Sequence, residues 1–445
     1  MPFSFSDPMV LFVIAVALFI VTHIVLRWAL PVAFIVVSVV IAALGGFIFT
    51  SSSDLSPGWQ ESPFRHLVEG SFGFINLAIA LFAGTFFGQM VRASGAADAA
   101  ADGALRLANG RVLPVLVLAA VPIFAVGMFV GLAGVAVLSA GVFAVPALRR
   151  LGYSDATIAA FIAVLATAGM IAPPVNVPAM HLADGVNMPW TNVARSLLAL
   201  SVPFALLALA WFRWGQRRNA EVAAAARSTV DWGRAMAGIA PFAVMMLIWI
   251  AVRIFPFELV DPSSPAVLII GGLAALPMMK PGDFKKVIDS TFTGTPLILA
   301  AVLVTVGVLI QVMTLTGVRG EIVIRVMSID PPWIYLGLIV GMPLLGGALT
   351  SMSVADVMGV PAAFSFFKLG LSANFIISVA ALSSIAALAE FIPPTSVAAA
   401  LACYVVGGGT TVGQVFRRAW PAMIPLVAIA VLMLVFANDL AGWLS

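Results

Sequence analysis

The chain has very little charge, cysteine and histidine, and each of these shortages excludes a class of protein. Only 9% of its 445 residues are Asp, Glu, Lys or Arg, whereas a soluble domain carries about 25%. With so few charges the chain cannot cover a water-facing surface, so it is neither a soluble nor a disordered protein, nor a nucleic-acid binder. The single cysteine, Cys403, excludes a disulfide framework and a multi-thiolate metal site. The 3 histidines, His23, His66 and His181, are far apart in sequence, which argues against a histidine metal cluster.

The sequence is rich in long runs of apolar residues. Hydrophobic residues make up 62% of the chain, and the mean hydropathy is +1.14. A helix of about 20 apolar residues crosses the hydrocarbon core of a bilayer. Runs of that kind recur with short gaps from Met9 to Ala437. The sequence therefore predicts an all-α, polytopic membrane protein.

Three short patterns of the first half return in the same order in the second half. One such echo can arise by chance, but three in the same order indicate an internal duplication. The paired segments are Gln89–Gly95 with Gln311–Gly317, Arg149–Ser154 with Phe367–Ser372, and Ile171–Val175 with Phe391–Thr395.

The repeat and the polar stretch between its halves predict five parts of the chain. Residues 1–70 are expected to form N-terminal scaffold helices, and residues 71–212 the first repeat, with a hairpin and a broken helix. A polar linker at 213–235 is expected in the cytoplasm. Residues 236–286 are expected to form further scaffold helices, and residues 287–445 the second repeat, with its own hairpin and broken helix.

The basic residues predict the orientation of the chain. If sides alternate at every span and each Gly-rich segment is a re-entrant hairpin, 16 of the 22 lysines and arginines fall on one side and 6 on the other. Because cytoplasmic loops are rich in Lys and Arg, the first side is the cytoplasmic one. The two repeats then enter the membrane from opposite faces. Inverted repeats are typical of secondary transporters, which open a central site to each side in turn.

Each repeat contains two consecutive prolines within an apolar run. Proline cannot continue a helix, and the freed carbonyls need protein or a cavity around them. The breaks predict two discontinuous helices, whose carbonyls can bind a cation and whose N-termini can bind an anion; the alternative is a simple kink. His181 and Asp184 follow the first break and are expected at the mouth of the site. The candidate substrate-binding residues are Asn176, Pro173, Pro174, Pro393, Pro394, Thr395 and Ser396.

Two segments rich in small residues, Gly127–Pro146 and Gly346–Phe367, are the predicted re-entrant hairpins. Small residues also suit tight helix packing, which is the alternative role for any one glycine. Hydroxyls and carboxylates in an apolar setting are oxygen ligands for a small cation. Glu390 is an intramembrane carboxylate, which favours a function, although a hydrogen-bonded structural role is the alternative. The candidates for sodium binding or proton coupling are Gly127, Gly131, Gly169, Thr350, Ser351, Asp356 and Glu390.

Common enzyme motifs are missing from the sequence. It has no His-Glu-x-x-His metalloprotease run, no phosphate-binding Gly-Lys-Ser loop and no Gly-x-Ser-x-Gly elbow. The chain is therefore not expected to be an enzyme, and ATP-driven transport would require another subunit. Besides a secondary transporter, an ion channel and an intramembrane enzyme are the alternatives. A channel would need a continuous polar stripe, and the duplicated breaks argue against it.

The sequence resembles the large membrane subunit of tripartite ATP-independent periplasmic (TRAP) transporters. The resemblance implies an elevator-type transporter of the bacterial inner membrane, coupled to sodium, that imports small organic acids. It also implies two partners, a small four-helix membrane subunit and a soluble periplasmic substrate-binding protein, and no cofactor beyond sodium ions. The match runs from Val32 to Phe436, and its most specific motifs are Gly127, Gly131, Gly141 and Pro146, followed by Leu148–Tyr153 and Gly169–Pro174.

The chain departs from the family pattern at three places. Val130-Gly131-Leu132 stands where the family usually has Ser-Gly-Ser, which removes two hydroxyls. Gly346–Ser351 replaces the pattern Gly-Met-Phe-x-Asp, and Glu390 takes a position that is normally apolar. The expected function is therefore import of a small carboxylate, coupled to a sodium or proton gradient. The alternative is a stand-alone ion-coupled organic-anion symporter that works without a binding protein.

Overall fold

The computed structural model describes residues 7–46, 63–109, 111–216, 231–254, 263–330, 333–370 and 374–444. Within these ranges every regular element is a helix, as the composition predicts. Most of the expected linker at 213–235 lies outside the described residues.

The first half of the chain forms a series of helices that ends at Gly215, three residues into the expected linker. They are α1 (Pro8–Phe19), η1 (Ile20–Val25), α2 (Leu30–Leu44), α3 (Pro63–Ala93), α4 (Ala96–Leu107), α5 (Val112–Val130), α6 (Ala133–Leu138), α7 (Gly141–Arg150), α8 (Asp155–Met170), α9 (Val177–Gly185), η3 (Trp190–Val193), α10 (Ala194–Ala210) and η4 (Trp211–Gly215).

The second half of the chain forms a further series of helices. They are α12 (Trp232–Ile254), α13 (Ser264–Leu273), η5 (Leu276–Met278), α14 (Asp283–Thr291), α15 (Thr295–Leu315), α16 (Val318–Met327), α17 (Trp333–Ala348), α18 (Ser351–Val354), η6 (Ala355–Gly359), α19 (Val360–Lys368), α20 (Phe375–Ala386), η7 (Ala387–Phe391), α21 (Val397–Val406), α22 (Val412–Val435) and α23 (Ala437–Leu444).

Several of these helices can cross a bilayer. Among the described residues, 7 helical segments are long and apolar enough to do so by length and composition. Shorter apolar helices, including those beside the two Pro-Pro pairs, lie among them. The chain is therefore a multi-pass helical membrane protein, and the 7 segments are Pro8–Val25, Leu67–Ala93, Val112–Val130, Ala194–Gly215, Trp232–Val252, Asp283–Leu315 and Val412–Val435.

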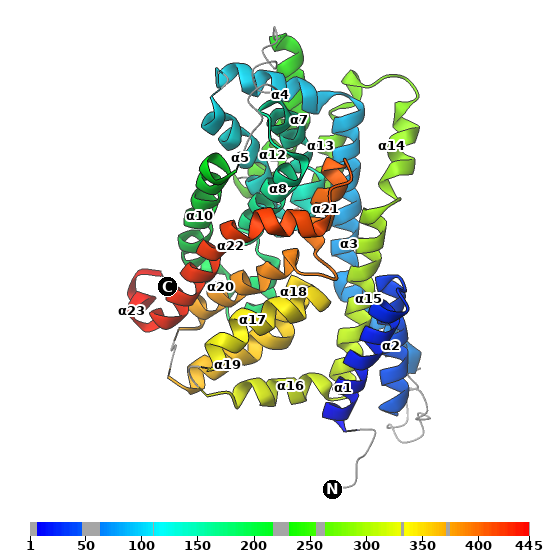
Figure 1. Ribbon diagram of the computed structural model, residues 1–445, viewed down its shortest axis with the longest axis vertical. Coiled ribbons are helices and arrows are strands. Elements are labelled where there is room, and N and C mark those ends of the chain that lie inside the picture. Colours follow the sequence, from blue (N-terminus) through cyan, green and yellow to red (C-terminus); the bar gives the residue numbers. More distant parts are fainter. Residues whose placement is uncertain are drawn as a thin grey trace.

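Two long helices, α3 and α15, pack side by side along one edge of the molecule (Figure 1). Their backbones meet at Gly70 and Gly307, where a Cβ added to Gly70 would lie 2.5 Å from the Gly307 carbonyl oxygen. Glycine is needed at this crossing because any side chain would push the helices apart. Helices α2 and α13 pack against the same pair, and α12 packs against α13. We call α2, α3, α12, α13 and α15 the outer group.

Helix α8 is the centre of a second set of helices. Its side chains are buried from Thr157 to Met170, as expected for a helix that is surrounded by protein on all sides. Helices α5, α21 and α22 pack against it, and α20 packs against α22. We call α5–α9 and α17–α22 the inner group.

Both Pro-Pro pairs interrupt a helix at the centre of this inner group. Helix α8 ends at Met170, three residues before Pro173, and α9 begins at Val177. In the second half, α20 passes into the 3-10 helix η7, and α21 begins only at Val397. The two consecutive prolines explain the interruptions, because two successive amide donors are missing. The two predicted helix breaks are therefore present.

Candidate functional site

The first break is closed by one buried amide side chain. Asn176 is 0% exposed, and its Oδ1 accepts a hydrogen bond from the Ala179 amide at 2.9 Å, which caps α9. Its Nδ2 donates to the Ile171 carbonyl at 3.1 Å, at the end of α8. Asn176 thus satisfies free groups on both of the helix ends that the prolines separate.

The end of α5 packs against this first break. The Val175 amide, directly after the two prolines, donates to the Met128 carbonyl at 3.2 Å. A Cβ on Gly127 would lie 2.9 Å from Gly169, and one on Gly131 would lie 2.8 Å from the Val175 side chain. Gly131 also has a φ of 71°, which residues with a side chain rarely adopt. The three predicted glycines therefore meet at the first break, where they let the backbones approach.

The second break meets α17 in the same way. The Thr395 amide, directly after Pro394, donates to the Gly347 carbonyl at 3.0 Å, and the Thr395 hydroxyl donates to the same oxygen at 2.9 Å. A Cβ on Gly347 would lie 2.5 Å from the Ile392 side chain, so glycine again allows a close approach. In both halves of the chain, the amide after the two prolines donates to a carbonyl in the last turn of an earlier helix. That helix is α5 at the first break and α17 at the second.

Glu390 lies at the second break and is only 4% exposed. One carboxylate oxygen accepts a hydrogen bond from Ser351 Oγ at 2.6 Å, and the other accepts one from the Ala398 amide at 3.0 Å. Ala398 is in the first turn of α21, where amides have no partner within the helix. The helix dipole also favours a carboxylate at this end. Glu390 thereby joins the start of α18 to the start of α21.

The other hydroxyls near the second break differ in how they are used. The Thr350 and Ser353 hydroxyls lie 2.7 Å apart, and Thr350 caps α18 by accepting from the Ser353 amide at 3.3 Å. Ser396 is buried and adopts a φ of 40°. Its hydroxyl has no hydrogen-bond partner among the residues that the structure describes. Because a buried hydroxyl without a partner is unfavourable, Ser396 has hydrogen-bonding capacity left for a ligand.

Asp356, the remaining candidate for cation binding, has partners of its own. Its carboxylate lies 3.2 Å from Nδ1 of His181 in α9, and its carbonyl accepts a hydrogen bond from Arg319 of α16 at 3.4 Å. The His181 ring stacks on Phe74 of α3, with ring centroids 6.4 Å apart. Sequence reasoning did not find the His181–Asp356 pair, because the two residues belong to different halves of the chain and no local pattern links them.

The segments with the two breaks are neighbours in the core. A Cβ on Gly134 of α6 would lie 2.9 Å from the Leu401 side chain and 3.3 Å from that of Val397 at the start of α21. Helix α8 also packs against α21. Within the described ranges, no three His, Cys, Asp or Glu side chains form a group that can hold a metal ion. The polar atoms around the second break are hydroxyl oxygens, carbonyl oxygens and the carboxylate of Glu390. Oxygen atoms of these kinds are the ligands of hard cations.

Two interrupted helices in the core of a multi-pass helical protein are typical of membrane transport proteins. More specifically, the chain belongs to the family described as "Tripartite ATP-independent periplasmic transporter, DctM component", whose model matches residues 10–438. The resemblance noted in the sequence is thereby confirmed. The chain is the large permease component of a secondary transport system, and it is not an enzyme.

The fold is similar to that of a solved transporter. The YdaH transporter of Alcanivorax borkumensis matches with a TM-score of 0.52 and 14% sequence identity, over 94% of this chain and 99% of that one. At this level of identity the likeness shows the fold alone. No curated protein matches the chain.

Proposed function

We propose that the chain imports a small organic acid across the bacterial inner membrane, coupled to a sodium or proton gradient. In this proposal it works with a small four-helix membrane subunit and a periplasmic substrate-binding protein, as its family implies. A stand-alone symporter without a binding protein is the second candidate. It is favoured by the buried apolar residues Val130 and Leu132, which stand where family members carry hydroxyls.

The main support for this proposal is a hydrogen bond that occurs in equivalent form at both helix breaks. The same local arrangement occurs in both halves: the Val175 amide donates to the Met128 carbonyl, and the Thr395 amide donates to the Gly347 carbonyl. This supports a structural repeat, with residues 127–146 and 346–367 as its re-entrant hairpins. The connecting helices α4 and α16 lie at opposite ends of the molecule (Figure 1), as repeats of opposite orientation require. The inner group then moves as a unit against the outer group, in the manner of an elevator.

The start of α21 is the part of the site best suited to a carboxylate. The amides at a helix N-terminus and the helix dipole attract an anion. The Ser396 hydroxyl at this end is buried and has no partner among the described residues, so it can donate to a carboxylate oxygen. Asn176 caps the start of α9, and Glu390 accepts from one amide at the start of α21; the buried Ser396 hydroxyl is what distinguishes the start of α21. Thr395 and the proline pairs shape the breaks, and Ser396 contacts the substrate.

The position of Glu390 provides a reason for coupling. Its carboxylate lies at the same N-terminus of α21 as the proposed substrate site, and two neighbouring negative charges repel each other. A sodium ion bound with the help of the Ser351 hydroxyl, or a proton on Glu390, removes that repulsion. The cation and the acid therefore favour each other's binding, as symport requires.

Uptake into proteoliposomes tests the proposal. The chain is purified with its small subunit, and labelled mono- and dicarboxylates are offered with imposed sodium or proton gradients, with and without the binding protein. We expect accumulation that requires both an inward gradient and the binding protein. Gradient-driven uptake without the binding protein would support the stand-alone symporter. If no organic acid accumulates under either gradient, the proposal is wrong.

A further inference from the structure

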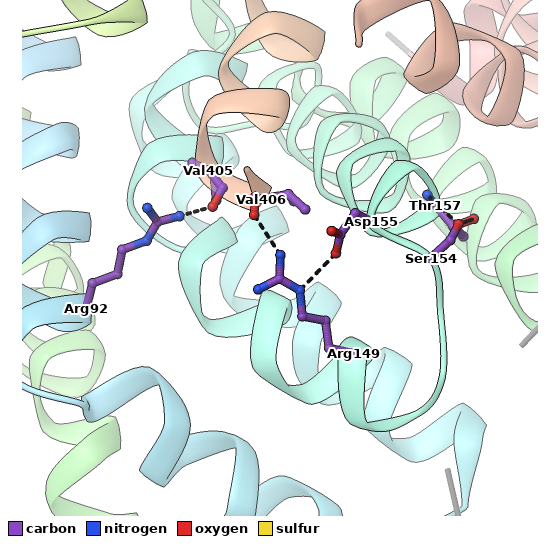
Figure 2. Close-up of polar contacts among 7 residues, drawn as sticks. All are labelled: Arg92, Arg149, Ser154, Asp155, Thr157, Val405 and Val406. Carbon is purple, nitrogen blue, oxygen red and sulfur yellow. Dashed lines mark hydrogen bonds and ion pairs between the residues drawn. The ribbon is translucent and has the colours of Figure 1, made fainter. Parts of the chain in front are cut away.

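The C-terminal end of α21 is held by two arginines from different helices (Figure 2). Arg149 of α7 donates to the Val406 carbonyl at 2.7 Å and pairs with Asp155, at the start of α8, at 2.8 Å. Arg92, near the end of α3, donates to the Val405 carbonyl. The last carbonyls of a helix lack partners within the helix and carry partial negative charge. Both guanidinium groups therefore stabilise this end of α21.

The two arginines differ in the set of helices to which they belong. Arg149 and both of its partners lie in the inner group, so their contacts hold that group together. Arg92 lies in α3, which belongs to the outer group. Gln89, one turn earlier on α3, donates from Nε2 to the Tyr404 hydroxyl of α21 at 2.9 Å. Gln89 and Arg92 therefore fasten α21 to helices outside its own group.

Two glycines on the same face of α3 let this helix pack closely against the inner group. Gly84 and Gly88 lie eight and four residues before Arg92, on the same side of the helix. A Cβ on Gly84 would lie 3.1 Å from the Val135 side chain of α6, and one on Gly88 would lie 3.1 Å from that of Val142 in α7. At these positions α3 approaches α6 and α7 closely, because a Cβ on Gly88 would clash with the Leu138 carbonyl, and the Phe87 ring of α3 also packs on Phe143 of α7. Gln89 and Arg92, at the end of this closely packed face, add directional hydrogen bonds from α3 to α21.

This end of the interface is also open. A cavity of about 470 Å³ lies beside the two arginines and is lined by residues of α3, α4, α7 and α21. Arg92 is itself exposed, so its guanidinium group can turn to water when it leaves the carbonyl. Since its acceptor is a backbone carbonyl and not a carboxylate, separation leaves no buried unpaired charge. The contact is thus one that can break and form again.

We propose that Gln89 and Arg92 form a catch that holds α21, and with it the inner group, in the conformation of this structure, and that the catch opens in each transport cycle. The inference rests on the proposed function in one respect, namely that the inner group moves against α3. A third contact at this end joins Arg150 of α7 to Asp98 and Asp102 of α4. Helix α4 also packs against α12 of the outer group, so this ion pair is a second polar link between the groups, and the catch concerns the contacts that hold α21 itself.

A buried reporter cysteine tests the catch in the full-length chain, in a background with Cys403→Ala. Val142 is 3% exposed and faces Gly88, so the thiol of Val142→Cys is shielded while α3 and α7 stay in contact. We expect Arg92→Met to raise the rate at which a small maleimide alkylates this thiol in proteoliposomes by about tenfold. Arg92→Lys keeps a donor for the carbonyl and should restore part of the difference. Neither substrate nor ion is needed, so the result is independent of whether the proposed transport is observed.

Two arginine variants are the matched controls. Arg149→Met breaks contacts within the inner group, so it should lower thermal stability without changing the alkylation rate. Arg106→Met removes an exposed arginine of α4 and should change neither. If Arg92→Met leaves the alkylation rate at that of its parent, or if Arg106→Met raises it equally, the catch is refuted.

A double-mutant cycle tests the second contact of the catch. Gln89→Leu and Tyr404→Phe each remove one partner of the same hydrogen bond. Each should raise the alkylation rate severalfold, and the double variant should be no faster than the faster single variant, because residues in contact are not additive. Independent, additive effects would refute a shared contact. Monodisperse elution of each variant shows that the comparison is made on folded protein.

Discussion

Replacing Glu390 separates its structural role from its role in coupling. The carboxylate accepts hydrogen bonds from the Ser351 hydroxyl and the Ala398 amide. Glutamine keeps one acceptor for the amide, and its NH₂ group can donate to Ser351, whose hydroxyl can turn to accept. Glu390→Gln should therefore lower the free energy of unfolding by only about 1 kcal/mol, the difference between a charged and a neutral hydrogen bond. Glu390→Ala leaves two buried donors unpaired, at about 1–3 kcal/mol each.

The assay combines unfolding in detergent with uptake into proteoliposomes. Glu390→Gln should fold nearly as well as the wild type but lose the dependence of uptake on the cation gradient, because an amide neither repels the substrate nor attracts the cation. Glu390→Ala should lose stability as well. Glu321→Gln is the matched control, because Glu321 pairs with Arg325 across one helical turn, and a surface pair of this kind contributes only about 0.3–0.5 kcal/mol.

Two results would refute this reasoning. If Glu390→Gln keeps the wild-type rate, gradient dependence and pH profile of uptake, the carboxylate is structural and has no part in coupling. If Glu390→Ala unfolds under the same conditions as the wild type, its two hydrogen bonds do not support α21, and the structural argument also fails.

Four other variants or sets of variants test the remaining inferences. Cysteines in the Arg149–Gly152 turn should react with an impermeant thiol reagent in inside-out vesicles but not in intact cells, since basic loops face the cytoplasm; labelling from outside would contradict the inverted arrangement. Asn176→Ala should lower stability by about 1–2 kcal/mol through loss of a helix cap, as well as weaken uptake; wild-type stability would show that this cap is dispensable. Ser396→Ala should weaken uptake severalfold at unchanged stability, because its hydroxyl has no partner in the described structure; unchanged uptake would move the site elsewhere. Gly169→Ala should sharply reduce the amount of folded protein in the membrane, because its Cβ would meet the Phe124 carbonyl; wild-type yield would show that the crossing can relax.

The breaks could be predicted from the sequence because their cause is local. A proline pair removes two amide donors wherever it stands, so helices end near Pro173 and Pro393 regardless of their surroundings. The all-helical, membrane-spanning class was equally accessible, since it depends on the length and apolarity of each run. The Gly-rich segments were recognisable from composition, but composition does not say which backbone each glycine approaches.

The partners of the polar side chains could not be predicted in the same way. Glu390 stands out in the sequence as an intramembrane carboxylate, yet its bond to Ser351 depends on how α18 and η7 pack. Asn176 was identified as polar beside a break, but its use as a link between two helix ends follows from the angle at which the chain turns. Arg92 is an ordinary basic residue at the end of a span. Its contact with the end of α21 joins residues more than 300 positions apart, so no local pattern predicts it.

Helix α21 connects the proposed site with the proposed catch. Its ten residues span about 15 Å, with Glu390 bonded at one end and Arg92 and Arg149 at the other. Both kinds of charge match the helix dipole, so each end is stabilised by what it contacts. In the proposed movement of the inner group, Glu390 and Arg149 move with α21, and Arg92 and Gln89 are left behind on α3. The polar contacts that α21 loses are then confined to one guanidinium and one amide. A change of that size is within what differential binding of a substrate and its coupling ion can offset, so loading at one end of the helix can release the other.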